Sequence, residues 1–399
     1  YNTNTAGSAT ITNNGIVHFA DASTAGGASI NNINTVIFHD TSTAGNATIT
    51  QNGNTGSYFL FTDDSTAGNA AITNNGVMGF VDSSSAGSAT ITNTGVLTFS
   101  NTSTAGGSTI FNNSGTLSFN DTSTVGNATI TNNSDLRFNN SSTAGSALAF
   151  IINNDDVQFN DTSTAGSALI LNNGYLGFTG TSNAGSATIT NNSSGSMSFT
   201  GASSASNATI TNIGTLSFWG TSTGGGATIT NNAFQTFYQT SSAGSSTIYN
   251  NANLVFRDTS TAGNATITNN GDLAFHNTST AGSSTIYNNS NLVFRASSSA
   301  DNAAITNGSS LIFLGGSTAG NATIANNGTL SFIGNSTAGN AALINNVAGT
   351  VDFSGSAGLN NDFRLSAGSI AGAGNYLLGA DRLTVGSNNL STEVSGVIS

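Results

Sequence analysis

Hydrophobic and polar residues alternate along this chain in two short segments that recur about every 19 residues. In the segment NATITQ, Ile49 falls on one side of an extended chain and Thr48 and Thr50 fall on the other, which is the period-two pattern of a β-strand. After a short turn, a second alternating segment carries two bulky inward residues, as at Leu254 and Phe256. Each repeat therefore predicts two β-strands joined by turns.

Phe closes the second strand of each repeat and fixes the repeat length. Successive Phe residues are 19 apart, except for one gap of 20, three of 21 and one of 23. The positions are Phe19, Phe38, Phe61, Phe80, Phe99, Phe119, Phe138, Phe159, Phe178, Phe199, Phe218, Phe237, Phe256, Phe275, Phe294, Phe313, Phe332 and Phe353. Helical repeats need about 33 residues or more, so this period predicts an all-β fold, a right-handed parallel β-helix (β-solenoid) with about 19-residue coils. Stacked coils place equivalent residues about 4.8 Å apart, so the Phe side chains should form one ladder.

A polar residue recurs at an inward position of the first strand. Asn follows the inward Ile by two residues in nearly every repeat, as at Asn32, Asn93 and Asn132, and Gln51 replaces it once. Stacked amides can hydrogen-bond from coil to coil, which satisfies polar groups that are turned away from water. We therefore expect an amide ladder inside the solenoid.

The repeat also predicts how the chain is organised. Residues 1–355 are expected to form a repetitive β-solenoid of about 18 coils, and residues 356–399 divergent, Gly-rich C-terminal coils that continue it. Additional residues interrupt the period near 52–58, 146–151, 193–196 and 347–350. We expect these residues to form loops at coil corners.

Composition and charge exclude several classes of partner. With five Arg, no Lys and seventeen acidic residues, the chain has a formal net charge of −12. Nucleic acids and anionic membranes bind basic surfaces, so neither is expected as a partner. No run of about 18 apolar residues occurs, so we expect no direct membrane insertion of this segment. The chain has no Cys, and burial and hydrogen-bond ladders must supply its stability.

The tandem STAGNATITNNG-type repeats resemble the β-solenoid passenger domains of bacterial autotransporters. The stretch SIAGAGNYLLGADRLTVGSNNLSTEVSGVIS, residues 369–399, is similar to the region where such passengers pass into the autotransporter-associated β-strand repeat. The resemblance covers nearly the whole chain. It implies a right-handed parallel β-helix, secretion through an outer-membrane β-barrel, and an extracellular or bacterial cell-surface location, often for adhesion or aggregation. A signal peptide, linker and barrel are expected outside these 399 residues.

Catalytic chemistry has little support in the sequence. Enzymatic β-helices that cleave polysaccharides need acidic residues clustered with one another or with basic residues. The three histidines, His18, His39 and His276, are expected to lie far apart, and the neighbours Asp63 and Asp64 should point to opposite faces of a strand. We therefore expect no enzyme activity, no catalytic residues and no cofactor.

Acidic residues recur two positions after Phe in four successive coils. They are Asp21, Asp40, Asp63 and Asp82. Like charges about 5 Å apart repel one another, and a cation such as Ca²⁺ could relieve that repulsion. The alternative is an exposed Asp that begins a DTS or DAS turn. The sequence lacks the calcium-binding GGxGxD pattern, so the turn is the favoured interpretation and no metal site is predicted.

The position directly after Phe is expected to face solvent and is unusual in five consecutive coils. There it carries Trp219, Tyr238, Arg257, His276 and Arg295. This set includes the only Trp and two of the five Arg, and the outward Val255, Val293 and Ile312 lie next to it. Aromatic rings stack on sugars and Arg binds carboxylates or sulfates, so surface glycans are one candidate partner. Other copies of the chain are the second candidate, because an exposed apolar band can be a contact between solenoids.

These observations predict a non-enzymatic, secreted or surface-displayed structural or adhesive rod that resembles an autotransporter passenger and mediates adhesion or aggregation. Two alternatives remain open. The chain could be a subunit of a self-assembling extracellular fibre, because uncapped solenoid ends expose strand edges. It could also be a polysaccharide-active β-helix enzyme.

Overall fold

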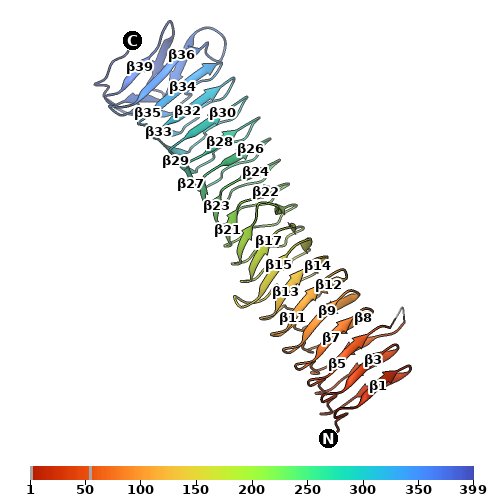
Figure 1. Ribbon diagram of the computed structural model, residues 1–399. Helices are drawn as coiled ribbons and strands as arrows, with labels where there is room; N and C mark the ends of the chain where they lie inside the picture. Colours follow the sequence, from red (N-terminus) through yellow and green to blue (C-terminus); the bar gives the residue numbers. More distant parts are fainter. Residues whose placement is uncertain (1–2, 54–55) are drawn as a thin grey trace. The chain divides into compact units, whose positions relative to one another are not determined.

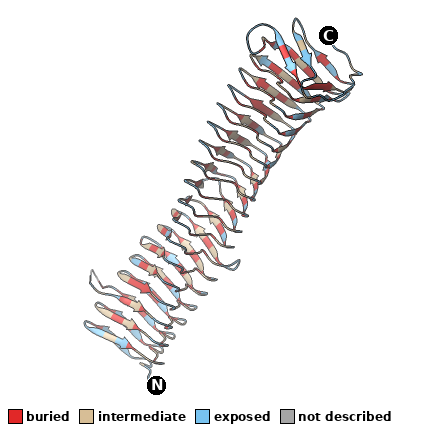
Figure 2. Cartoon of the chain, turned by 180° about the vertical axis from the view of Figure 1, so that it is seen from behind, coloured by how far each residue is buried: buried red, intermediate tan, exposed pale blue. Residues whose placement is uncertain are grey.

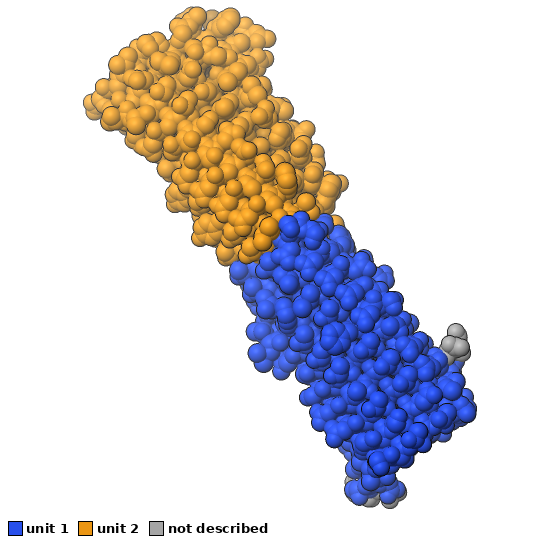
Figure 3. Space-filling model, viewed as in Figure 1, with its two compact units in different colours: residues 1–197, 202–209 blue, residues 198–201, 210–399 orange. Residues whose placement is uncertain are grey.

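The computed structural model describes residues 3–53 and 56–399. Over these residues the chain forms strands and turns and contains no helix, so no helix crosses a membrane there. The fold is an all-β parallel β-solenoid of about 20 turns. The chain divides into two compact units (Figure 3). Unit 1 consists of residues 1–197 and 202–209, and unit 2 consists of residues 198–201 and 210–399. The predicted fold class is confirmed; the right-handed sense stays a prediction.

Unit 1 contains two ladders of parallel strands (Figure 1). The first ladder consists of β1 (Thr10–Asn13), β3 (Ser29–Asn32), β5 (Thr48–Gln51), β7 (Ala71–Asn74), β9 (Thr90–Asn93), β11 (Thr109–Asn112), β13 (Thr129–Asn132), β15 (Phe150–Asn153), β17 (Leu169–Asn172) and β19 (Thr188–Asn191). The second consists of β2 (Ile16–Phe19), β4 (Thr35–Phe38), β6 (Phe59–Phe61), β8 (Val77–Phe80), β10 (Val96–Phe99), β12 (Thr116–Phe119), β14 (Asp135–Phe138), β16 (Asp156–Phe159) and β18 (Tyr175–Phe178). The strands β20 (Ser196–Phe199) and β21 (Thr209–Asn212) each have residues in both units.

Unit 2 repeats the same arrangement. Its first ladder consists of β23 (Thr228–Asn231), β25 (Thr247–Asn250), β27 (Thr266–Asn269), β29 (Thr285–Asn288), β31 (Ala304–Asn307), β33 (Thr323–Asn326), β35 (Ala342–Asn345) and β38 (Ser369–Ala371). Its second consists of β22 (Thr215–Phe218), β24 (Phe234–Phe237), β26 (Asn253–Phe256), β28 (Asp272–Phe275), β30 (Asn291–Phe294), β32 (Ser310–Leu314), β34 (Thr329–Gly334), β36 (Thr350–Ser356) and β39 (Asn375–Leu377). The strands β37 (Arg364–Ala367) and β40 (Arg382–Val385) pair separately with each other.

A third side of each coil is formed by the STAG segment, which contributes one bridging residue per coil. In unit 1 the bridges link Thr24 to Thr43 and Thr43 to Thr66. The Gly that follows has a positive φ, 65° at Gly45, and an added Cβ there would lie 2.8 Å from the carbonyl oxygen of Gly26 in the preceding coil. Gly suits a corner that combines this backbone conformation with such close stacking, although Ser206 and Asp301 adopt the same conformation in two coils, with φ of 50° and 54°.

The Phe ladder fills the core of both units. In unit 1 the rings of Phe80 and Phe99 are parallel within 3° with centroids 4.7 Å apart, and in unit 2 Phe256 and Phe275 repeat this at 4.7 Å and 6°. These rings are fully buried, and buried and exposed residues alternate along the strands (Figure 2). The predicted inward ladder is confirmed.

The amide ladder lies beside the Phe ladder and is also confirmed. Asn250 donates from Nδ2 to Oδ1 of Asn269 at 2.7 Å and to the backbone oxygen of Asp272 at 2.9 Å. Gln51 joins the ladder, because its Oε1 accepts a hydrogen bond from Asn32 at 2.5 Å. Each buried amide is thus satisfied by the next coil, as burial of a polar group requires.

The C-terminal residues continue both ladders of unit 2 past residue 356. The strand β38 pairs with β35, and β39 pairs with β36. Tyr376 in β39 is fully buried, is the register partner of Val351 in β36, and donates from its hydroxyl to the backbone oxygen of Ala371 at 2.8 Å. Burial raises the pKa of Tyr376 to about 12.

The extra residues fall between strands, as predicted. Residues 146–149 precede β15, residues 192–195 connect β19 to β20, and residues 346–349 connect β35 to β36. The first predicted loop, near 52–58, includes residues 54 and 55, which lie outside the described residues. The strands β13 and β15 pair in register across the second insertion, whereas β36, which follows the last insertion, pairs with β34 through a register shift between Ser331 and Ile333.

One core residue departs from the apolar pattern. Gln235 occupies the position held by Leu216 in the coil before and Leu254 in the coil after it. Its side chain is 1% exposed, and neither of its amide atoms has a hydrogen-bond partner. An unsatisfied buried amide destabilises a fold, so this coil is a weak point of unit 2.

We expect Phe256→Ala to destabilise unit 2 by about 3–5 kcal/mol, because stacked backbones on both sides of the cavity prevent it from collapsing. Hydrogen exchange measures this locally: amide protection in the coils from Phe237 to Phe275 should fall. Unchanged protection there would contradict the role assigned to the Phe ladder.

We expect Gln235→Leu to stabilise unit 2 by about 1–3 kcal/mol, because it removes an unsatisfied amide from an apolar row. Gln51→Leu is the matched control. It should destabilise the protein, because the buried Nδ2 of Asn32 would lose one of its two acceptors and keep only the backbone oxygen of Asn34. Denaturant unfolding of both variants measures the difference, and the same sign of change in both would refute the explanation.

Candidate functional site

Five side chains predicted to share one outward row do share it. Each follows the Phe of its coil in the second ladder of unit 2, where the strands pair without a shift from Phe218 to Phe294. The backbone confirms the register, because Tyr238 donates from N to the oxygen of Phe218 and Arg257 to that of Phe237, both at 2.9 Å. We call this set, Trp219, Tyr238, Arg257, His276 and Arg295, the aromatic-cationic row.

The two aromatic rings of the row stack on each other. Trp219 and Tyr238 have ring centroids 3.8 Å apart and planes inclined by 12°. Trp219 is 38% exposed, whereas Tyr238 is half-buried. Each ring therefore covers one face of the other, and at most one face of each is left for a sugar. The pair therefore offers less open aromatic surface than two separate rings would.

The cationic part of the row concentrates positive charge in three consecutive coils. Arg257 and Arg295 are exposed and flank the half-buried His276. Among the described residues, neither guanidinium forms an ion pair or a side-chain hydrogen bond; the ion pairs found there are His39 with Asp40 and Arg137 with Asp135. Two unpaired Arg in a chain of net charge −12 are free to bind an anionic group.

His276 is electrostatically linked to its neighbours. Burial lowers the pKa of His276 below its ordinary value, and the charges of Arg257 and Arg295 lower it further. Both effects favour the neutral imidazole, and the permanent charge of the row is that of its two Arg. Asp272, in the strand β28 that precedes His276, accepts a hydrogen bond from Asn291 at 3.2 Å.

The apolar surroundings of the row differ in part from expectation. Val255 and Ile312 are half-buried on the outer face, but Val293 is only 4% exposed and adds little accessible surface. Beyond Arg295 the row continues with Leu314 and Ile333, which pair with each other, and Ile333 is 39% exposed. The row is thus aromatic at one end, cationic in the middle and aliphatic at the other end.

The acidic residues of unit 1 occupy a strained corner. Asp21, Asp40, Asp63 and Asp82 all have φ between 54° and 57°. Each of the last three accepts, through its carboxylate, a hydrogen bond from the backbone N–H of the preceding Asp, for example Asp40 from Asp21 at 3.0 Å. Asp and Asn tolerate this left-handed conformation better than other side chains. The predicted turn is therefore present, and it requires a residue that tolerates a positive φ, which sequence reasoning missed.

The geometry defines the class of the protein as a parallel β-solenoid with one mixed aromatic and cationic surface row. Comparison of the chain with protein-family models, with curated proteins and with solved structures finds no match.

We expect nuclear magnetic resonance titration to give His276 a pKa below 6.5, and Arg257→Gln to raise it, because one of the two flanking charges is lost. Since the folded pKa is lowered, the unfolded chain binds the proton more readily, and this residue's contribution to stability falls as pH drops below about 6.5. Arg137→Gln, in unit 1, is the control and should leave the His276 titration unchanged. A His276 pKa at or above the ordinary value would contradict the assigned environment.

Proposed function

We propose that this chain is a non-enzymatic, secreted or surface-displayed structural and adhesive solenoid that mediates adhesion or aggregation. The observation that carries the proposal is the pair of unpaired guanidinium groups, Arg257 and Arg295, in one row with the exposed Trp219. Elsewhere on the solenoid the same position mostly holds small or polar residues, such as Ser100 and Asn139. A solenoid coil does not require Trp, Arg or His there, so the row supports a role outside folding.

The charge of the row favours an acidic partner. Arg binds carboxylates and sulfates through paired, charge-assisted hydrogen bonds, and burial of an adjacent aromatic residue adds apolar contact area. Surface glycans that carry such groups are one partner of this chemistry. A second copy of the chain is the other, because the corners of unit 1 expose carboxylates in successive coils.

We further propose that the chain is a passenger-like segment of a bacterial autotransporter, located outside the cell and exported through an outer-membrane β-barrel. The support is the resemblance of the STAGNATITNNG-type repeats and of residues 369–399, together with a β-solenoid fold. A fibre subunit is the alternative that shares this fold. A polysaccharide-active enzyme is the more distant alternative.

We expect replacement of Trp219, Arg257 and Arg295 by Ser to weaken capture of an acidic polysaccharide, self-association, or both, while the melting temperature stays nearly unchanged. Surface substitutions rarely alter stability, whereas central aromatic and Arg residues dominate binding. Immobilised polygalacturonate and dextran sulfate measure glycan capture, and sedimentation velocity measures self-association.

The control is the double substitution Arg137→Ser and Arg364→Ser. It removes the same number of Arg residues as the triple variant, and it should retain binding. Intact glycan capture and intact self-association in the Trp219, Arg257 and Arg295 variant would refute the proposed role of the row. Electron microscopy of the native material separates discrete cell-bound rods from continuous fibres.

A further inference from the structure

The structure brings three potential metal ligands together at one corner of unit 1. One donor atom each from His39, Asp40 and Asp63 lies within 4.8 Å of the other two. All three side chains are partly or largely exposed. Two of the three residues belong to the acidic corner, and the third is an imidazole that follows Phe38.

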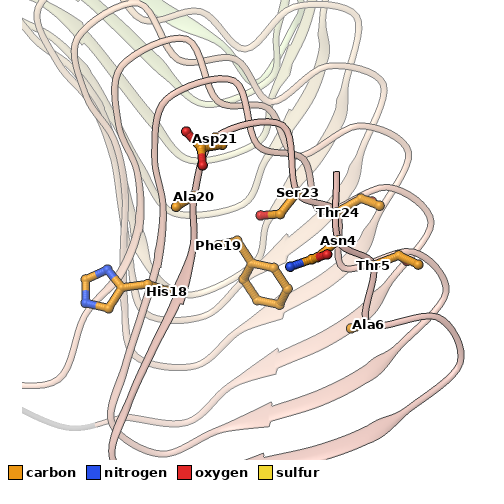
Figure 4. A pocket seen from close by; sticks show the side chains of 9 residues that line it. All are labelled: Asn4, Thr5, Ala6, His18, Phe19, Ala20, Asp21, Ser23 and Thr24. Atoms are coloured by element: carbon orange, nitrogen blue, oxygen red, sulfur yellow. The ribbon is translucent and has the colours of Figure 1, made fainter. Parts of the chain in front are cut away.

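A second imidazole lies against the first. The rings of His18 and His39 meet edge to face, with centroids 5.5 Å apart and planes inclined by 83°. The expectation that all the histidines lie far apart is therefore wrong for this pair, because His18 precedes Phe19 and His39 follows Phe38 in the next coil. Figure 4 shows His18 outside the first coil, whereas Phe19 lies inside it. His18 therefore adjoins one of the three clustered ligands, while its own nitrogens lie outside the group whose atoms are within 4.8 Å of one another.

The fold does not require these residue types. The same corner is occupied by Asn101 and by Gly180 in other coils, with φ of 58° and 65°. Asn140 also performs the hydrogen-bonding role of the Asp side chain, because it accepts the backbone N–H of Asp121 at 3.1 Å. Adjacent carboxylates repel one another, so a turn alone would be served as well by neutral side chains.

The carboxylates are already oriented by the backbone. Asp40 accepts through Oδ2 from the N–H of Asp21 at 3.0 Å, and Asp63 accepts through Oδ2 from the N–H of Asp40 at 3.1 Å. A carboxylate has further lone pairs after one such bond. His39 Nδ1 lies 3.0 Å from Asp40 Oδ2, so the imidazole and the carboxylate point to the same place.

We propose that this corner binds one divalent first-row transition metal ion, such as Zn²⁺, through His39, Asp40 and Asp63, with His18 as the fourth ligand. Imidazole and carboxylate together suit Zn²⁺, whereas Ca²⁺ takes oxygen ligands only. The ligands come from three successive coils, so the ion links these coils and relieves the repulsion between Asp40 and Asp63. This site is independent of the aromatic-cationic row, which lies in unit 2.

Isothermal titration of the chain with Zn²⁺ at neutral pH tests the proposal. We expect one ion per chain, and weakening of binding by about tenfold or more in each of His39→Gln, Asp40→Asn and Asp63→Asn, with a smaller loss in His18→Gln. The Asn variants keep the left-handed turn and the amide acceptor, so the melting temperature without metal should stay unchanged. Co²⁺ in place of Zn²⁺ should give d–d absorption bands that His39→Gln alters.

Two matched controls use equivalent positions elsewhere. Asp121→Asn changes the same corner in a coil without histidine, and His276→Gln removes the histidine that lies between two Arg; both should bind Zn²⁺ as the unaltered chain does. Absence of Zn²⁺ uptake would overturn the proposal. Zn²⁺ uptake that persists in His39→Gln would also overturn it. Preferential binding of Ca²⁺ that His39→Gln does not change would overturn it too, because either result assigns the ion to carboxylates alone.

Discussion

Within each unit, the rest of the structure depends on the parallel hydrogen-bond ladder that joins one coil to the next, in register except at the shift where β34 pairs with β36. Strands in such a ladder lie about 4.8 Å apart, so every side chain sits directly beside its equivalent in the neighbouring coil. Each position therefore favours a side chain that packs well against an identical side chain at this distance. Parallel stacking of the Phe rings and amide pairing of the Asn side chains meet that condition, and both repeat through each unit.

The same constraint explains what sequence reasoning predicted well. Phe256 and Ile49 are inward because alternation fixes the face and the period fixes the neighbour, and both are local properties of the sequence. The register of Trp219 and Arg257 follows from their position relative to Phe. For a solenoid, the rows of a surface can therefore be derived from spacing alone.

Two features could not be derived in this way. Contact between His18 and His39 joins positions on opposite sides of Phe in successive coils, and the period places only equivalent positions beside each other. The left-handed backbone conformation of Asp40 is the second feature, and the identity of a single residue does not reveal its φ. The recurrence of Asp, Asn and Gly at that position, as at Asn101 and Gly180, was the signal that a left-handed corner was required.

In-register stacking also has an electrostatic consequence, because it converts a repeated charge into a line of like charges. In unit 1 the carboxylates of the corners from Asp21 to Asp82 repel one another. Backbone N–H groups offset part of this repulsion by donating hydrogen bonds to the carboxylates. In unit 2 the Arg257 and Arg295 pair is separated by one coil, and the neutral form of the intervening His276 is favoured because burial and both Arg lower its pKa. Repulsion along the row is thereby limited while both guanidinium groups remain exposed. A ladder can thus concentrate positive charge on its surface without placing two permanent cations in adjacent coils.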